Sequence, residues 1–178
     1  MQILRKEKKY QGYIIDVSIE HFQHPSGTLT SREIVEHPGG SVVLPVFENG
    51  DILLIQQYRH PIGKEIIELP AGKLDYNEDP QHCAARELQE ETGYTAHQWT
   101  KLTTLLTTPG FCNEHLHIYL AQNLFPSPHG QALEEGEQSI KLLRIPLDEA
   151  IEKIYNGVIV DGKSIVGIML GKEKLRKL

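Results

Sequence analysis

Residues 72–78 read GKLDYNE and residues 86–93 read RELQEETG, and this stretch decides the fold. Asp79 and Pro80, which lie between the two runs, are typical of a helix N-cap and a first helical position. Gly93 is typical of the residue at which a helix stops. The stretch therefore predicts a helix that begins after Asp79 and ends at Gly93.

Three glutamates share one face of this predicted helix. Glu87, Glu90 and Glu91 stand at positions i, i+3 and i+4, where side chains are neighbours on the helix surface. Like charges at these spacings repel by roughly 0.2–0.5 kcal/mol per pair. A hard divalent cation such as Mg²⁺, which takes oxygen ligands, would offset the repulsion. The alternative is an ordinary solvated acidic face, and the three glutamates alone do not decide between the two.

Two neighbouring features favour a ligand site. Gly72 ends the run Leu69-Pro70-Ala71-Gly72, a turn that can direct backbone groups at a ligand. Arg86 lies beside the glutamates and can form a forked pair with a carboxylate such as Glu78, which would orient it. Together they favour a metal site over a solvated helix.

The whole stretch resembles the Nudix box. That box is a glycine, five residues, a glutamate, seven residues, Arg-Glu, an aliphatic residue, any residue, Glu-Glu, any residue, a glycine and an aliphatic residue. Every spacing matches, and Tyr94 in the last aliphatic position is the one departure. The resemblance implies a Nudix fold, which is an α/β/α sandwich around a mixed sheet. It also implies a metal site formed by Glu87, Glu91, Glu90 and the backbone carbonyl of Ala71, shaped by the box residues Gly72, Glu78, Arg86 and Gly93.

The rest of the chain predicts an α+β arrangement, because strands lie on both sides of the box helix and helices come late. Asn49-Gly50 is a strong hairpin signal between the two strands that flank it. Residues 1–40 are expected to form an antiparallel β extension and residues 41–178 the Nudix domain. The expected strands are centred on Ile15–Ile19 and on residues 29–36, 41–47, 51–57, 64–69, 99–106, 116–121 and 139–145, and the late helices on 146–156 and 163–174.

Composition limits the classes of partner. The chain has 178 residues, of which 39% are hydrophobic and 24% charged, enough for one ordinary domain with a core. A net charge of −6 argues against a nucleic-acid partner. No stretch approaches membrane-spanning length, and residues 1–10 lack the apolar run of a signal peptide. Cys83 and Cys112 suggest neither a disulfide framework nor a zinc site, so a reducing cytoplasm is the expected location.

Motifs outside the box resemble the ADP-ribose pyrophosphatase branch of the family. Pro109 lies fifteen residues beyond Tyr94, a position typical of Nudix enzymes that act on ADP-sugars. The resemblance extends over residues 56–61, 68–72, 109–114, 146–150 and 161–164. It implies that Arg59, Glu68, Glu114 and Gly110 bind substrate.

In this branch the general base tends to come from a loop after the box. Glu134, Glu135 and Glu137 are the candidates, with Glu137 ranked before Glu135, and Glu90 shares the catalytic site as a ligand or as the partner of one. Each loop acid, taken singly, is more often a solvated surface residue than a base. Glu114 is next in line as the base.

The resemblance implies Mg²⁺-dependent hydrolysis of ADP-ribose to AMP and ribose 5-phosphate, with Mn²⁺ as a possible substitute for Mg²⁺. The same chemistry on GDP-mannose or ADP-glucose is the close alternative. A non-catalytic nucleotide sensor is the more distant one, because such domains usually lose box glutamates. Related enzymes exchange their N-terminal region between two subunits, so a homodimer is expected.

Overall fold

The computed structural model describes residues 2–177, which form two compact units. One unit contains the chain up to Gly39 together with Leu106–His115. The other contains Gly40–Leu105 and the chain from Leu116 onward.

The first unit is built on a three-stranded antiparallel sheet in the order β1 (Gln2–Gln11), β2 (Asp16–Gln23), β3 (Leu29–Glu36). The segment 106–115 is attached to β3: Val35 N donates to Phe111 O at 2.8 Å, and Asn113 N donates to Val35 O at 3.2 Å.

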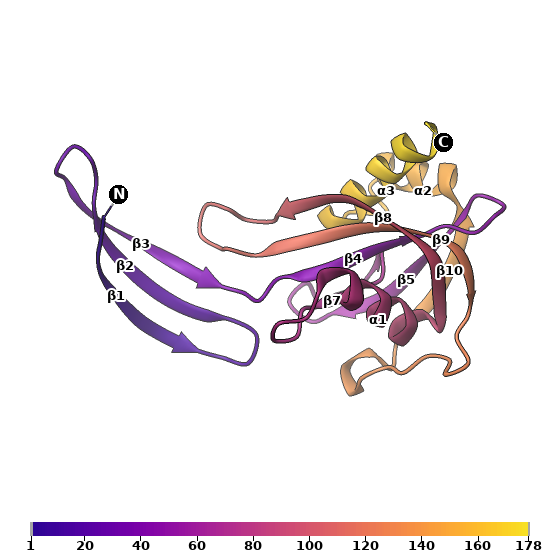
Figure 1. Ribbon diagram of the computed structural model, residues 1–178, viewed down its shortest axis with the longest axis horizontal. Coiled ribbons are helices and arrows are strands. Elements are labelled where there is room, and N and C mark those ends of the chain that lie inside the picture. The colour runs from indigo at the N-terminus through magenta and orange to yellow at the C-terminus, as the bar shows by residue number, and fades with distance from the viewer. Residues whose placement is uncertain (1, 178) are drawn as a thin grey trace. The chain divides into compact units, whose positions relative to one another are not determined.

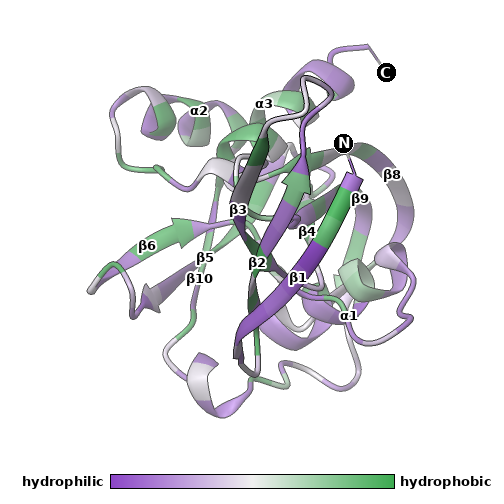
Figure 2. Cartoon of the chain, turned by 90° about the vertical axis from the view of Figure 1, so that its left-hand side faces the viewer, coloured by the Kyte–Doolittle hydropathy of each residue, from purple (hydrophilic) through white to green (hydrophobic). Residues whose placement is uncertain are grey.

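Strand β1 spans Gln2–Gln11 and includes most of the segment that lacks an apolar run. It is mostly hydrophilic (Figure 2) and its side chains are largely exposed. The same sheet and its turns nevertheless expose large apolar side chains, namely Ile3, Leu4, Tyr10, Tyr13, Ile14 and Leu29.

The second unit contains two sheets and three helices. One sheet has the order β7 (Ala71–Lys73), β4 (Gly40–Pro45), β9 (His115–Pro126), β8 (Tyr94–Leu106). It is mixed, because β4 runs antiparallel to β7 and parallel to β9. The second sheet has the order β10 (Lys141–Pro146), β5 (Asp51–Arg59), β6 (Lys64–Glu68). The helices are α1 (Pro80–Thr92), α2 (Leu147–Tyr155) and α3 (Gly162–Leu175).

The hairpin expected at Asn49-Gly50 is present at its tip but does not continue as a ladder between β4 and β5. A tight turn is present, with Gly50 N donating to Phe47 O at 2.9 Å, but β4 and β5 belong to different sheets. Just beyond β4, Val46 forms an isolated antiparallel bridge with Ile52, and Phe47 N donates to Asp51 O at 2.9 Å. The turn residues were recognised correctly, but longer-range pairing takes β4 to β7 and β9, and takes β5 to β6 and β10.

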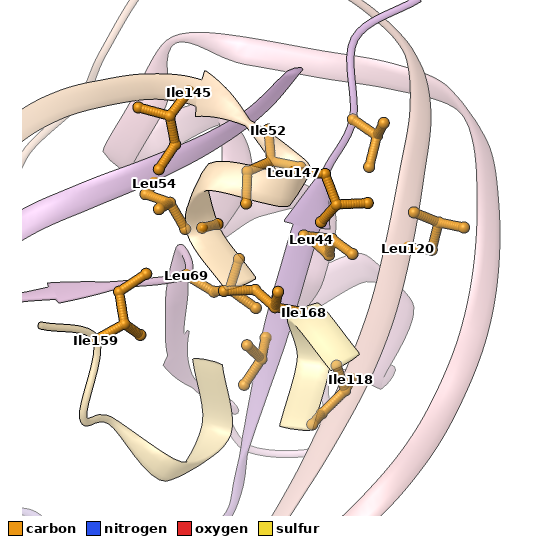
Figure 3. Close-up of a cluster of buried hydrophobic side chains, with 13 residues drawn as sticks. Leu44, Ile52, Leu54, Leu69, Ile118, Leu120, Ile145, Leu147, Ile159 and Ile168 are labelled. Atoms are coloured by element: carbon orange, nitrogen blue, oxygen red, sulfur yellow. The ribbon is translucent and has the colours of Figure 1, made fainter. Parts of the chain in front are cut away.

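Strand β4 is buried on both faces. Successive side chains of the strand point to opposite faces of the sheet and so enter different layers of the sandwich. Val42 and Leu44 belong to a core that also contains Ile168 of α3, whereas Val43 packs with Ala84 and Leu88 of α1. Figure 3 shows the larger core, to which both sheets, α2 and α3 contribute. Figure 1 shows α1 on one side of these strands and α2 and α3 on the other. The predicted α+β class and α/β/α sandwich are therefore confirmed.

Within residues 2–177, none of the helices is both long enough and apolar enough to cross a membrane.

Candidate functional site

The predicted limits of the box helix are confirmed. Asp79 Oδ1 accepts hydrogen bonds from Gln81 N at 2.9 Å and His82 N at 3.2 Å, and Pro80 follows at the first helical position. At the other end Gly93 adopts a left-handed φ of 73°, and its N–H donates to Gln89 O at 2.8 Å. Local capping chemistry fixes this helix, which is why the sequence alone predicted it.

Two of the three aligned glutamates are buried. Glu87 is 6% exposed and Glu91 is 1% exposed, whereas Glu90 is partly exposed. A solvated acidic face therefore does not describe Glu87 and Glu91. An isolated buried carboxylate is costly, so these two groups need partners of opposite charge.

Arg86 supplies one such partner. Its Nε and Nη2 atoms each lie 3.0 Å from one oxygen of Glu78, which is the forked pair that the sequence suggested. The Arg86 guanidinium holds the pKa of Glu78 down at about 2. The remaining nitrogen, Nη1, donates to Glu87 Oε1 at 2.7 Å and Glu90 Oε2 at 2.9 Å. Arg86 therefore contacts three box glutamates at once.

The short strand β7 packs closely against the carboxylates of Glu87 and Glu91. Ala71 N donates to Glu91 Oε2 at 2.9 Å, so the Ala71 peptide lies at the Glu91 carboxyl group. A Cβ atom added at Gly72 would lie 1.9 Å from both Cδ and Oε1 of Glu87. A side chain at this position would therefore displace the Glu87 carboxylate.

The electrostatics of the pair suit a divalent cation. Burial raises the pKa of Glu87 to about 7, and burial also raises the pKa of Glu91 well above its usual range. Like-charge repulsion adds to these rises, since Glu87 raises the pKa of Glu91 and Glu90 raises the pKa of Glu87. Oxygen donors that repel each other are the ligands a hard cation prefers, so the residues fit Mg²⁺. Among residues 2–177, however, no three His, Cys, Asp or Glu side chains are already grouped as a metal site. Arg86 Nη1 instead contacts one carboxylate oxygen of Glu87 and one of Glu90.

A second charged cluster lies next to the box. Glu68 on β6 is only 2% exposed and is paired with two cations. Its Oε2 lies 2.8 Å from both Nε and Nη2 of Arg59, and its Oε1 accepts from Lys163 Nζ at 2.7 Å. Arg59 is close enough to Glu91 for its charge to lower the pKa of that carboxyl, against the larger effect of burial.

The loop acids differ in position. Glu135 and Glu137 lie on the short 3-10 helix η1 (Glu135–Glu137), where Glu135 is exposed. The charge of Glu137 raises the pKa of both Glu87 and Glu91, and Glu137 Oε2 accepts from Glu134 N at 3.1 Å.

The other two residues expected to bind substrate belong to the first unit. Glu114 accepts from Thr107 Oγ1 at 2.7 Å and lies 3.4 Å from His37 Nδ1. Gly110 is exposed, and a Cβ atom added there would meet no atom within 4 Å.

Sequence reasoning missed three residues that the fold brings to this region. Lys163 was part of a recognised motif, but nothing local showed that it pairs with Glu68, which lies 95 residues earlier. Gln89 and Gln131 connect α1 to the loop after β9, and a single glutamine carries no signal of such a contact.

Comparison with known proteins gives a consistent result. The family model described as NUDIX domain matches residues 37–164. An ADP-ribose pyrophosphatase of Bacillus subtilis is 38% identical over 93% of this chain and 89% of its own length. A methanol dehydrogenase activator of Bacillus methanolicus is 36% identical over the same shares of the two chains. A solved structure titled ADP compounds hydrolase has a TM-score of 0.85 at 22% identity, covering 99% of this chain and 94% of that one, which shows the fold. The chain therefore belongs to the Nudix hydrolase family.

Proposed function

We propose that this chain hydrolyses the pyrophosphate bond of ADP-ribose to AMP and ribose 5-phosphate, and that the reaction requires Mg²⁺, for which Mn²⁺ can substitute. One observation carries the proposal: two buried carboxylates, Glu87 and Glu91, lie one helical turn apart against the Ala71–Gly72 backbone. The resemblance to a named ADP-ribose pyrophosphatase over most of both chains supports the choice of substrate.

Glu87, Glu91 and the Ala71 carbonyl would hold the cation, with Glu90 as a further ligand or a partner of one. A bound divalent cation neutralises phosphate oxygens and lowers the pKa of coordinated water. Arg86 restrains Glu87 and Glu90 through its Nη1 atom and is itself fixed by the fork to Glu78. Such restraint keeps the ligand oxygens from drifting, and this limits the cost of assembling the site.

Arg59 is the proposed phosphate anchor. Its guanidinium is partly exposed, and Glu68 holds it from the buried side. The side chain is thus oriented before substrate arrives, and a planar fork suits phosphate oxygens. In this assignment Glu68 acts through Arg59, and Lys163 balances the second oxygen of Glu68.

Glu137 is the proposed general base. Its charge raises the pKa of both Glu87 and Glu91, and a carboxylate near them can take the proton of an attacking water. Glu135, on the same turn, is the alternative. Glu114 and Gly110 are retained as proposed substrate contacts.

We further propose a cytoplasmic homodimer that binds neither nucleic acid nor membrane. The free thiols Cys83 and Cys112 agree with a reducing compartment, and the net charge of −6 is unfavourable for nucleic-acid binding. The apolar side chains exposed on the β1–β3 sheet suit an interface, which residues 1–40 would form by exchange between subunits.

The test is a substrate panel. Purified protein is incubated with ADP-ribose, ADP-glucose and GDP-mannose, with Mg²⁺ or with EDTA, and products are separated by ion-exchange chromatography. The proposal predicts AMP and ribose 5-phosphate from ADP-ribose, highest kcat/KM for that substrate, and no product in EDTA. Preference for GDP-mannose would reassign the substrate, and binding without any hydrolysis would indicate a nucleotide sensor.

A further inference from the structure

The C-terminal end of α1 is attached to a segment that follows β9. Ser127 N donates to Gly93 O at 2.8 Å, and Gln89 Nε2 donates to Gly130 O at 2.7 Å. The segment 127–132 is thereby fixed at two points on the end of the box helix.

Two further bonds reach the backbone of the glutamates themselves. Ala132 N donates to Glu90 O at 2.9 Å, and Gln131 Nε2 donates to Glu91 O at 2.7 Å. The last carbonyl groups of a helix have no partner within it. Segment 127–132 therefore completes the C-terminal cap of α1 at the residues whose carboxylates form the site.

Close approach of the segment depends on Gly93. A Cβ atom at this position would lie 3.2 Å from Gln131 N and 3.3 Å from Gly130 C, and the φ of 73° already disfavours a side chain. Gly93 thus ends the helix and also leaves the space in which segment 127–132 packs.

The acid-bearing turn comes directly after this attachment. Glu134 N donates to Glu137 Oε2 at 3.1 Å, and Glu137 N donates to Glu134 O at 2.9 Å, which closes the turn. Ile140, which is buried, then leads into β10. In Figure 1 this orange loop lies beside α1. The loop 133–139 is therefore held at both ends, on one side by α1 and on the other by the sheet.

We propose that Gln89 and Gln131 are positioning residues for the hydrolysis: their side-chain amides hold segment 127–132 on α1, and this attachment brings Glu137 to the carboxylates of the same helix. The inference rests on the proposed function, because it assigns Glu137 the role of base. Neither glutamine touches the reacting atoms in this account. Both act by fixing the position of the loop that carries Glu137.

A double-mutant cycle tests the proposal. Gln89→Met and Gln131→Met, made together, keep side-chain length and remove both amides. We expect kcat for ADP-ribose to fall by about tenfold, since a small misplacement of a catalytic group is costly, while KM changes by less than about threefold. Glu137→Gln alone should lower kcat by about 10²-fold or more. In the Glu137→Gln background the two methionines should cause no further loss, because there is no longer a base to position.

Gln81→Met is the matched control, since this exposed glutamine lies at the opposite end of α1. It should leave kcat unchanged. An equal loss from the two methionines in both backgrounds would show that the glutamines support folding or the metal ligands instead, and would overturn the proposal. Wild-type kcat in the methionine double variant, or in Glu137→Gln, would overturn it too.

Hydrogen exchange separates this inference from the proposed function. In metal-free protein the methionine double variant should exchange faster over residues 127–139 than the wild type or Gln81→Met, whether or not hydrolysis occurs. Unchanged exchange there contradicts the attachment. Absence of hydrolysis by the wild type with increased exchange in the variant contradicts only the assigned reaction.

Discussion

Gly72 and the carboxyl group of Glu87 occupy space that no larger pair could share: a Cβ atom at position 72 would lie 1.9 Å from Glu87 Cδ. The obligatory glycine of the box thus has a steric cause at the site itself. The absence of a side chain at Gly72 allows the backbone of β7 to pack directly against the buried carboxylate of Glu87 on α1.

Gly72→Ala should therefore impair catalysis more than folding. The added methyl group must push Glu87 aside, so we expect turnover to fall by about 100-fold or more, with a loss of about 1–3 kcal/mol in the free energy of unfolding. Kinetics on ADP-ribose and urea unfolding measure the two effects. Gly162→Ala is the control, because a Cβ atom there meets open space. Near wild-type turnover in Gly72→Ala would contradict the steric account.

Glu87 should make the metal-free protein less stable as pH rises. Its pKa of about 7 in the folded state exceeds its usual value of 4.5, so the folded state binds this proton more tightly than the unfolded state. The resulting contribution to stability is fully present below about pH 4.5. That contribution is lost as pH rises through 7. At 1.36 kcal/mol per unit the full effect is about 3 kcal/mol. Urea unfolding in EDTA at pH 5 and pH 8 should show a larger decrease for the wild type than for Glu87→Gln, and equal decreases would contradict the shift.

Glu78 should behave in the opposite sense. Its pKa of about 2 lies below the usual 4.5, so its contribution is present above pH 4.5 and lost as pH falls through 2. Glu78→Gln should cost about 3 kcal/mol of unfolding free energy at pH 7 and little near pH 2. Glu48→Gln, at an exposed position, should cost little at either pH. A pH-independent cost for Glu78→Gln would mean that the fork to Arg86 is not its source.

The parts of the fold that sequence predicted are those fixed by neighbours along the chain. The capping residues Asp79 and Gly93 define α1 by bonds to adjacent residues, and the Glu78–Arg86 fork spans only eight positions. The hairpin at Asn49-Gly50 is present only at its tip, because turn chemistry specifies the turn and not the partner of each strand.

The sequence predicted the carboxylates of the site but not the residues that bury and position them. The i, i+4 spacing identified Glu87 and Glu91, but their burial depends on β7, a three-residue strand with no sequence signal of its own. Lys163 and Gln131 meet the site across 95 and 40 residues, and contacts at such separation leave no local pattern.

The N-terminal sheet should be required for assembly. Three strands with exposed apolar side chains are marginally stable alone, so residues 1–38 are expected to need a partner chain. Light scattering should give a mass of about twice the 20.2 kDa of one chain. Deletion of residues 1–38 should yield an inactive or poorly soluble monomer. A fully active monomer at micromolar concentration for the intact chain would contradict the dimer.

The central claim is that the buried glutamates of α1 hold the cation that hydrolysis needs, and Glu91→Gln tests it most directly. The substitution keeps the shape of the side chain and removes a charge that repels Glu87, so the metal-free variant should fold as well as the wild type. Turnover of ADP-ribose is measured for both proteins over a range of Mg²⁺ concentrations. The account predicts a loss of about 10³-fold or more that saturating Mg²⁺ does not restore. Near wild-type turnover by Glu91→Gln at saturating Mg²⁺ would contradict it.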